Sequence, residues 1–133
     1  MVDANVWFIA LTSQSSLGDQ CREELSADPN WIQPEHARIE VLRTLGKLEL
    51  SGSITSDDAD VFCVEVCKAP VLTIGNDSDL LSDAWKLRHN VSLYDAPYIV
   101  LAYRYASPLI TCDRRLAKAA ATAKIDVRLL SAD

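Results

Sequence analysis

Apolar and polar positions alternate along the chain in a way that predicts short strands separated by longer helices. The clearest segment, PEHARIEVLRTLGKLEL, covers residues 34–50 and begins with a proline, which is favourable in the first turn of a helix. Its apolar stripe consists of Ala37, Val41, Leu45 and Leu48. This spacing predicts an amphipathic helix that packs on the rest of the molecule through one face.

The remaining pattern predicts an α/β fold. Helices are expected over 6–12, 17–28, 34–50, 56–69, 76–90, a segment headed by Asp95, and 114–123. Strands are expected over 1–6, where the strand runs into a turn, and over 31–33, 71–74, 108–113 and 125–130. Such alternation indicates one central parallel sheet of four to five strands, flanked by helices on both faces. Because no linker, repeat or low-complexity tract interrupts it, we expect a single domain over 1–133.

Several acidic residues are explained by helix capping alone. Ser56 is the expected N-cap of the helix over 56–69, and Asp57, Asp58 and Asp60 follow it in the first turn or just beyond. Negative charges there interact favourably with the positive end of the helix dipole. We therefore interpret these three aspartates as capping residues and not as metal ligands.

The composition is that of a globular protein with a proper core. Of 133 residues, 49% are hydrophobic and 24% are charged, and no stretch reaches the ~18 apolar residues of a membrane span. The N-terminus lacks the basic start and cleavage site of a signal peptide, so a cytoplasmic protein is expected. The four cysteines have no zinc-like spacing and are expected to be reduced, mainly buried thiols: Cys21, Cys63, Cys67 and Cys112.

The formal charge of −6 argues against indiscriminate electrostatic binding to nucleic acid. It still allows a local basic rim. If four carboxylates hold divalent cations in one site, the remaining surface is close to balanced, and net charge alone does not decide between binding and not binding a polyanion.

Four carboxylates are expected at the ends or mouths of adjacent elements. Asp3 ends the first predicted strand and Asp113 the fourth, and sites in open α/β sheets form beyond such strand ends. Glu40 lies about 60° around its helix from Ala37, at the border of the buried stripe. Asp95 shares a helical face with apolar residues and points toward the interior at the leading end of its helix.

Each of these acids also has a purely structural explanation. Asp3 could cap the next turn, Glu40 could pair with a neighbour on the surface, and Asp95 could cap a helix whose first turn tolerates Pro97. Four carboxylates close together, however, destabilise a fold unless cations neutralise them. Carboxylates without histidine favour Mg²⁺ or Mn²⁺ over zinc.

Four blocks of the sequence resemble PIN-domain nucleases, in particular the VapC-type toxins of bacterial toxin–antitoxin pairs. They are VDAN at 2–5, IEVLRTL at 39–45, WKLRHNVSLYDAPYIVLA at 85–102 and PLITCDRRL at 108–116, of which the last two are the most specific. The resemblance implies a PIN-like fold and a Mg²⁺- or Mn²⁺-dependent endoribonuclease that leaves a 5′-phosphate and a 3′-hydroxyl. Residues 12–30 and 49–80 match the family only in pattern.

The resemblance also implies roles for individual residues. The catalytic, metal-binding positions of the family fall on Asp3, Glu40, Asp95 and Asp113, and the positions that support them fall on Asn5 and Thr111. The candidates for substrate contacts are Arg114, Arg115, Arg43 and Arg88, with solvated surface arginines as the alternative. We expect Trp85 in the core and both His36 and His89 at the surface.

Three functions compete at this point. The first is the RNA-cleaving toxin of a type II toxin–antitoxin system, a homodimer inhibited by a VapB-type antitoxin. The second is a PIN-like module that binds RNA or protein without nuclease activity, which would be typical of a chain that has lost one of the acids. A receiver domain is rejected, because its third strand ends in an aspartate whereas VLTIG at 71–75 ends without one. The sequence does not distinguish transfer, ribosomal and messenger RNA as the substrate.

Overall fold

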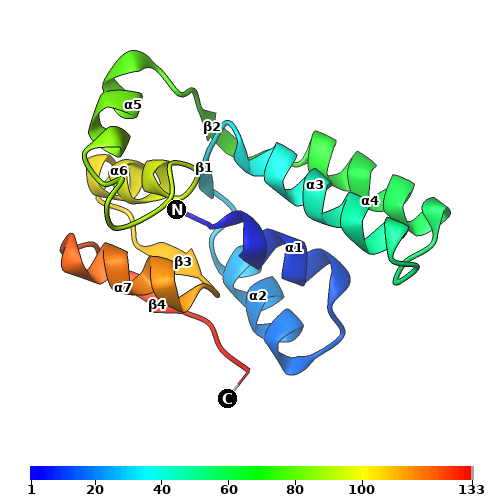
Figure 1. The fold of residues 1–133 in the computed structure, drawn as a ribbon. Coiled ribbons are helices and arrows are strands. Elements are labelled where there is room, and N and C mark those ends of the chain that lie inside the picture. Colours follow the sequence, from blue (N-terminus) through cyan, green and yellow to red (C-terminus); the bar gives the residue numbers. More distant parts are fainter. Residues whose placement is uncertain (133) are drawn as a thin grey trace.

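Seven helices and four short strands follow one another along residues 1–132, which are the residues described by the computed structural model (Figure 1). The helices are α1 (Ala4–Thr12), α2 (Ser16–Ala27), α3 (Ala37–Leu50), α4 (Ser56–Lys68), α5 (Ser78–Trp85), α6 (Ala96–Arg104) and α7 (Arg114–Thr122). The strands are β1 (Ile32–Pro34), β2 (Leu72–Ile74), β3 (Leu109–Thr111) and β4 (Val127–Leu129). The expected α/β alternation is confirmed.

The expectation of one central sheet is wrong. β1 pairs with β2 and β3 with β4, giving two separate parallel sheets of two strands each. Residues 1–3 lie between them: Val2 N–H donates to the Ile32 oxygen (3.2 Å) and Asp3 N–H to the Ile110 oxygen (3.0 Å). Because α1 already begins at Ala4, this segment is too short for a ladder and forms only an isolated bridge between Val2 and Ile110.

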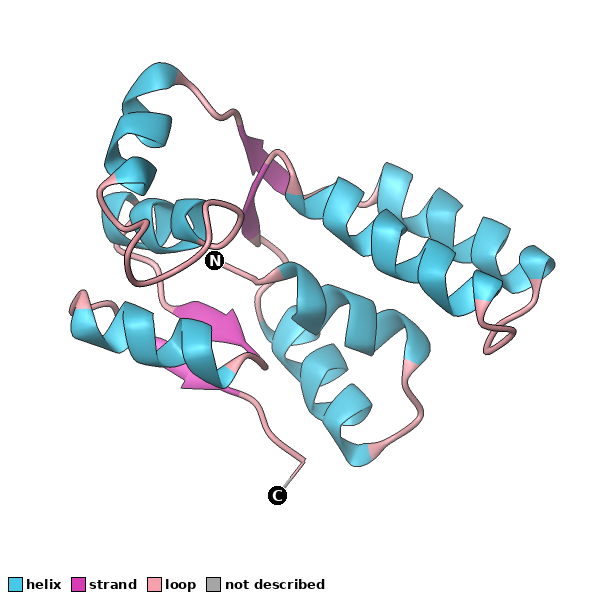
Figure 2. Ribbon diagram, viewed as in Figure 1, coloured by secondary structure: helices cyan, strands magenta, loops and turns pink. Residues whose placement is uncertain are grey.

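The helices lie around these strands in three groups (Figures 1 and 2). α3 and α4 form a hairpin that extends to one side, α1 and α2 pack together at the centre, and α5, α6 and α7 lie on the opposite side. Among residues 1–132, none of the helices has the length and apolar character needed to cross a membrane.

The amphipathic stripe of α3 packs inward as predicted, except at its end. Ala37, Val41 and Leu45 are buried, while Leu48 is only half-buried. The helix starts at Ala37 and not at Pro34, because Pro34 belongs to β1, where it lies opposite Ile74. Proline is compatible with such a strand end, since its missing N–H is not needed there.

The N-cap of α4 is Thr55 and not Ser56. The Thr55 hydroxyl accepts a hydrogen bond from the Asp58 N–H (3.1 Å). Asp57 and Asp58 lie in the first turn and are exposed, in agreement with the interpretation that they favour the positive end of the helix.

The core is built around α6, whose residues 96–102 are all buried. Trp85 is not part of it: this residue is 54% exposed at the end of α5, and the Arg88 guanidinium lies over its ring, 4.4 Å from the centroid. Of the four cysteines, all of them free, only Cys21 is buried, so the expectation of mainly buried thiols is wrong; Cys67 is exposed and the other two are half-buried.

Candidate active site

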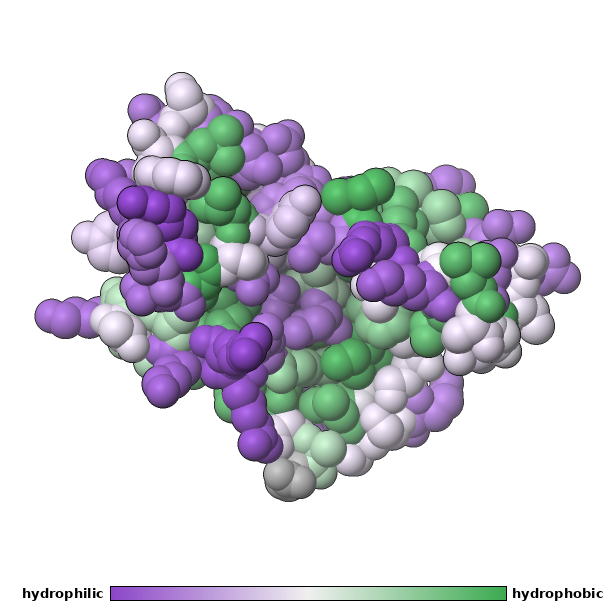
Figure 3. Space-filling view, viewed as in Figure 1, coloured by the Kyte–Doolittle hydropathy of each residue, from purple (hydrophilic) through white to green (hydrophobic). Residues whose placement is uncertain are grey.

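Four acidic side chains from four separate parts of the chain line one pocket of about 220 Å³. Asp3 follows the bridging residue Val2, Glu40 lies in the first turn of α3, and Asp95 and Asp113 immediately precede α6 and α7. Figure 3 shows a hollow near the centre of this face, with hydrophilic side chains at its base. The fold thus brings together all four acids that the sequence singled out.

Asp3 and Asp113 are connected by Thr111 at the end of β3. The Thr111 hydroxyl donates to Asp3 Oδ2 (2.7 Å) and accepts from the Asp113 N–H (2.9 Å). Asn5 lies at the same strand end, where its side-chain oxygen accepts from the Cys112 N–H (3.3 Å). These bonds fix the end of β3 against the start of α1. The hydrogen bond from Thr111 also gives the buried carboxylate of Asp3 a partner.

Asp113 has a second role as the N-cap of α7. Its Oδ1 atom accepts hydrogen bonds from the N–H groups of Arg115 (2.8 Å) and Leu116 (3.2 Å). These are two of the backbone donors that a helix leaves without intrahelical partners. Capping therefore fixes the orientation of a carboxylate that also lines the pocket.

Asp95 occupies the N-cap position of α6 but does not cap it with its side chain. Its backbone is helical (φ −86°, ψ −33°), and the carboxylate makes no capping hydrogen bond. Burial and the negative charge of Asp113 raise the pKa of Asp95, while a hydrogen bond from Ser92 and the proximity of His36 act in the opposite direction. The structural alternative of a capping carboxylate does not apply to this residue.

Glu40 is held by two residues that the sequence analysis missed. Tyr98 donates its hydroxyl to Glu40 Oε1 (3.1 Å), and His36 Nε2 lies 3.4 Å from the same oxygen. The imidazole is positioned in turn by the Tyr94 carbonyl, 2.7 Å from Nε2, and by the Asn76 amide, 3.2 Å from Nδ1. Since a carbonyl can only accept, Nε2 carries a proton and Nδ1 can accept from Asn76.

The surface position expected for His36 is therefore wrong, as its side chain is only 13% exposed. Two weak signals were available in the sequence. His36 precedes Glu40 by four residues, which is the spacing of neighbours on a helix, and Tyr98 follows Asp95 by three. His89, in contrast, is exposed as expected.

Crowding and burial make two of the carboxylates unusually weak acids. Burial raises the pKa of Asp3 to about 7; the hydrogen bond from Thr111 opposes this rise, and the charges of the three other acids add to it. Burial also raises the pKa of Glu40 to about 7, opposed by the Tyr98 hydrogen bond and Arg43 and assisted by Asp95. A cation in the pocket would favour the charged forms of both.

The donor set fits a hard divalent cation without forming a complete cage. Within the described residues 1–132, no three His, Cys, Asp or Glu side chains form a ready-made metal-binding group. Mg²⁺ does not require one, because it commonly keeps several waters and binds through one or two carboxylates. Oxygen donors alone suit Mg²⁺ or Mn²⁺ better than softer metals.

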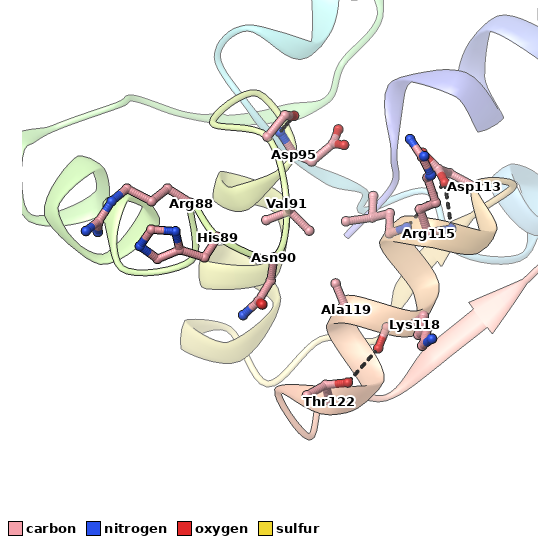
Figure 4. Close-up of a pocket in the computed structure, with 12 residues that line it drawn as sticks. Arg88, His89, Asn90, Val91, Asp95, Asp113, Arg115, Lys118, Ala119 and Thr122 are labelled. Carbon is pink, nitrogen blue, oxygen red and sulfur yellow. Dashed lines mark hydrogen bonds between the residues drawn. The ribbon is translucent and has the colours of Figure 1, made fainter.

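The predicted substrate-contacting arginines are not all near this pocket. Arg88 and Arg115 line a larger groove of about 760 Å³ that shares Asp95 and Asp113 with the acidic pocket (Figure 4). Arg43 and Arg114 are exposed and line neither cavity. Arg43 is nevertheless close enough to Glu40 for its charge to oppose the rise in the pKa of that carboxyl, so three of the four arginines adjoin the acids or the groove beside them.

Comparison with known proteins assigns the family. Residues 1–122 match the family model described as PIN domain. The chain therefore belongs to the PIN domain family.

The chain is also similar to proteins named as ribonucleases. It is 38% identical over 86 residues to Ribonuclease VapC3 of Mycobacterium tuberculosis, a match that covers 65% of this chain and 62% of that protein. It is 52% identical over 40 residues to Ribonuclease VapC1 of the same organism, covering 30% of each. Ribonuclease VapC3 of Pyrobaculum aerophilum is 29% identical over 121 residues, which cover 89% of this chain and 92% of the relative. The match thus spans less than two thirds of the length of the first relative.

Proposed function

We propose that this protein is a Mg²⁺- or Mn²⁺-dependent endoribonuclease that hydrolyses RNA phosphodiester bonds as the toxin of a type II toxin–antitoxin system in the cytoplasm. The observation that carries the proposal is the convergence of four carboxylates from distant segments on one pocket. A fold gains nothing from burying and crowding these carboxylates in the absence of a cation, since burial, assisted by the neighbouring acids, raises the pKa of Asp3 and of Glu40 to about 7. The similarity to proteins named Ribonuclease VapC supports the same activity.

In this proposal Asp3, Glu40, Asp95 and Asp113 hold the cation. Bound Mg²⁺ or Mn²⁺ would lower the pKa of the attacking water and stabilise the leaving oxygen. Thr111 and Asn5 keep the end of β3 in register with Asp3. No protein nucleophile is required, so a Ser-His or Cys-His pair is not needed.

The proposed substrate contacts are phosphate contacts. Arg115 lies beside Asp113, whereas Arg88 lines the same groove with its guanidinium over the Trp85 ring and directed away from the acids (Figure 4). Arg43, near Glu40, and Arg114 are exposed cations that could also contact RNA. Arginine suits this purpose because its planar guanidinium can donate two hydrogen bonds to one phosphate.

A matched pair of substitutions tests the nuclease proposal. Asn caps helices about as well as Asp, so Asp113→Asn removes a charge from the site and keeps the cap of α7. Asp77→Asn is the control, because Asp77 caps α5 through the Leu80 N–H (2.8 Å) and lines neither of the two cavities. With Mg²⁺ or Mn²⁺, Asp113→Asn should lose cleavage by orders of magnitude and Asp77→Asn should cleave like the wild type. EDTA should abolish cleavage by the wild type and by Asp77→Asn. RNA binding without cleavage by the wild type would instead support the non-nuclease module.

The proposed partners are a VapB-type antitoxin and a second copy of the chain. Large apolar and aromatic side chains remain exposed, including Tyr103 (74%), Tyr94 (71%) and Leu50 (89%), and a partner would cover some of them. Light scattering at high micromolar concentration should give the mass of a dimer, and a monomer there would contradict the homodimer. Cleavage that persists with a stoichiometric excess of the antitoxin would contradict inhibition.

A further inference from the structure

The larger groove next to the acidic pocket has a defined direction. It lies between the turn that precedes α6 and the helix α7, with Asp95 and Asp113 at one end (Figure 4). Asn90 and Thr122 lie toward the opposite end of the same view. A ligand that fills the groove therefore extends from the acids to these two polar side chains.

The two walls differ in character from the rim. Val91 and Ala119, which are half-buried, face each other from the turn and from α7, and the buried Leu116 completes an apolar lining. At the rim, Asn90 supplies both a donor and an acceptor. The Thr122 hydroxyl donates to the Lys118 carbonyl oxygen (3.0 Å), which leaves its own lone pairs able to accept.

These features suit a flat group with apolar faces and a polar edge. The groove volume of about 760 Å³ lies within the roughly 300–1,000 Å³ of small-ligand sites. Its charged lining, apart from the two acids of the pocket, consists of the cations Arg88, Arg115 and Lys118, in a protein whose formal charge is −6. A nucleotide has the required base and the required negative charge.

We propose that this groove is a nucleotide subsite that takes the base next to the cleaved bond, between Val91 and Ala119, with Asn90 at its polar edge. The proposal rests on the proposed function and adds to it the residues that select the base. Lys118 and Arg115 would contact the phosphates that follow along α7. Because a base inside a duplex is stacked and paired, only an unpaired nucleotide can enter.

The space between Val91 and Ala119, here called the apolar slot, distinguishes RNA from an acidic peptide. Such a peptide could bind the cations of the groove equally well. Glutamate or aspartate side chains would leave the surfaces of Val91 and Ala119 without a partner, whereas a base would cover both. Asn90 is also a suitable reader, since an Asn amide can make two hydrogen bonds to one base edge.

Filling the slot without changing charge is the sharpest test. Ala119→Leu places an isobutyl group in the groove, and Ala121→Leu is the matched control, exposed on the same helix and not part of the groove lining. Alanine and leucine are both good helix formers, so neither substitution should disturb α7. Fluorescence anisotropy with a labelled single-stranded RNA in EDTA measures binding separately from cleavage. We expect Ala119→Leu to raise Kd about tenfold and Ala121→Leu to leave it unchanged.

Two further variants test the RNA contacts at side chains that lie at the rim of the groove, where a substitution is not expected to disturb folding. Lys118→Ala changes only an exposed cation and should reduce the slope of log K against log salt by about 0.7, the value for one contact with single-stranded nucleic acid, whereas Lys47→Ala on α3 should not. Asn90→Ala should flatten the preference among homopolymeric oligonucleotides of the four bases.

The outcomes separate the subsite from the nuclease. Equal RNA affinity of Ala119→Leu and Ala121→Leu, in a protein that cleaves RNA, would overturn the subsite and leave the nuclease proposal standing. Loss of RNA binding in Ala119→Leu but not in Ala121→Leu, in a protein that never cleaves with Mg²⁺ or Mn²⁺, would overturn the nuclease proposal and leave the groove as a base-binding site without a cleaved bond. If the wild type binds a polyglutamate peptide but not RNA, and Ala119→Leu weakens the binding of the peptide, the groove is a site for an acidic peptide and the proposal is refuted.

Discussion

A carboxylate at the start of an apolar helix can either cap that helix or belong to a site, and Asp95 distinguishes the two roles. The sequence left both open, because Asp is a favoured N-cap and Pro97 suits a first turn. In the structure the side chain makes no capping hydrogen bond and lines the pocket shared with Asp113. Asp77 shows the contrast, because its carboxylate accepts from the Leu80 N–H.

Asp95→Asn should therefore stabilise the protein in the absence of metal. Burial and the charge of Asp113 raise the pKa of Asp95, so its charged form is unfavourable in the folded state near neutral pH. Removing that charge should raise Tm in EDTA. With millimolar Mg²⁺ the difference in Tm between the variant and the wild type should narrow or reverse. The reason is that a ligand bound only to the folded state adds RT ln(1 + [L]/Kd) to the free energy of unfolding. Cleavage should fall by orders of magnitude.

The control for this experiment is Asp77→Asn, which exchanges one good cap for another and should leave Tm, its dependence on Mg²⁺ and cleavage near the wild type. If Asp95→Asn behaves in the same way as this control, the carboxylate is not part of a metal site.

Tyr98 makes a second prediction possible at this scale. Its hydroxyl donates to Glu40 Oε1, and this hydrogen bond favours the charged carboxylate and lowers the pKa of Glu40. Tyr98→Phe should raise that pKa, so that Glu40 loses its charge at a higher pH. The acidic limb of the cleavage–pH profile should move to higher pH, and stability should fall by about 1 kcal/mol. A lower rate with an unchanged profile would mean that Tyr98 acts only through packing.

The four acids were accessible from the sequence, whereas the groups that hold Glu40 left only weak signals there. Strand ends and helix starts are visible in the periodicity, and the family resemblance added the identities. The contact of Tyr98 with Glu40 joins residues 58 positions apart, on α6 and α3. Such a contact follows from how two helices pack, which a one-dimensional pattern does not specify.

At the scale of elements, periodic helices were predictable and the sheet was not. A stripe repeated over several turns identified α3, but its start moved to Ala37 because tertiary pairing drew Pro34 into β1. Strands of three residues carry too little pattern to fix their partners. Trp85 was misplaced for a related reason: α5 ends at this residue, and a turn follows where the sequence predicted further helix.

The correction at the start of α4 can be tested directly. Thr55→Ala removes the oxygen that accepts from the Asp58 N–H and should lower the free energy of unfolding by about 1 kcal/mol. Ser56→Ala removes the hydroxyl that the sequence suggested as the cap and should have a much smaller effect. Urea denaturation of the two variants measures the difference, and a larger loss for Ser56→Ala would restore the original assignment.

At the scale of the whole molecule, an acidic protein concentrates opposite charges in adjoining cavities. The pocket holds four acids, and the neighbouring groove adds arginine and lysine side chains to two of them. A bound divalent cation would remove the repulsion in the first cavity and let a polyanion approach through the second. Net charge, the property accessible from composition, reveals neither arrangement.

This distribution predicts an unusual dependence of stability on pH. The pKa of Asp3 and that of Glu40 are about 7 in the folded protein, compared with about 4 in an unfolded chain. Between these values the folded state binds more protons than the unfolded state, so the free energy of unfolding should fall as pH rises and should level off above the folded pKa. In EDTA, Tm should therefore decrease from about pH 5 to about pH 8.

Mg²⁺ should reverse this loss, because it binds the deprotonated carboxylates of the folded state and adds stability where they are charged. The increase in Tm on adding millimolar Mg²⁺ should thus be large near pH 8 and small near pH 5. Asp3→Asn keeps an acceptor for the Thr111 hydroxyl and removes one titrating group, so its Tm in EDTA should depend less on pH. Calorimetric melts of both proteins across this range provide the measurement. A wild-type Tm that stays constant or rises with pH in EDTA would show that burial and the neighbouring acids do not raise the pKa of Asp3 and Glu40 in the folded molecule.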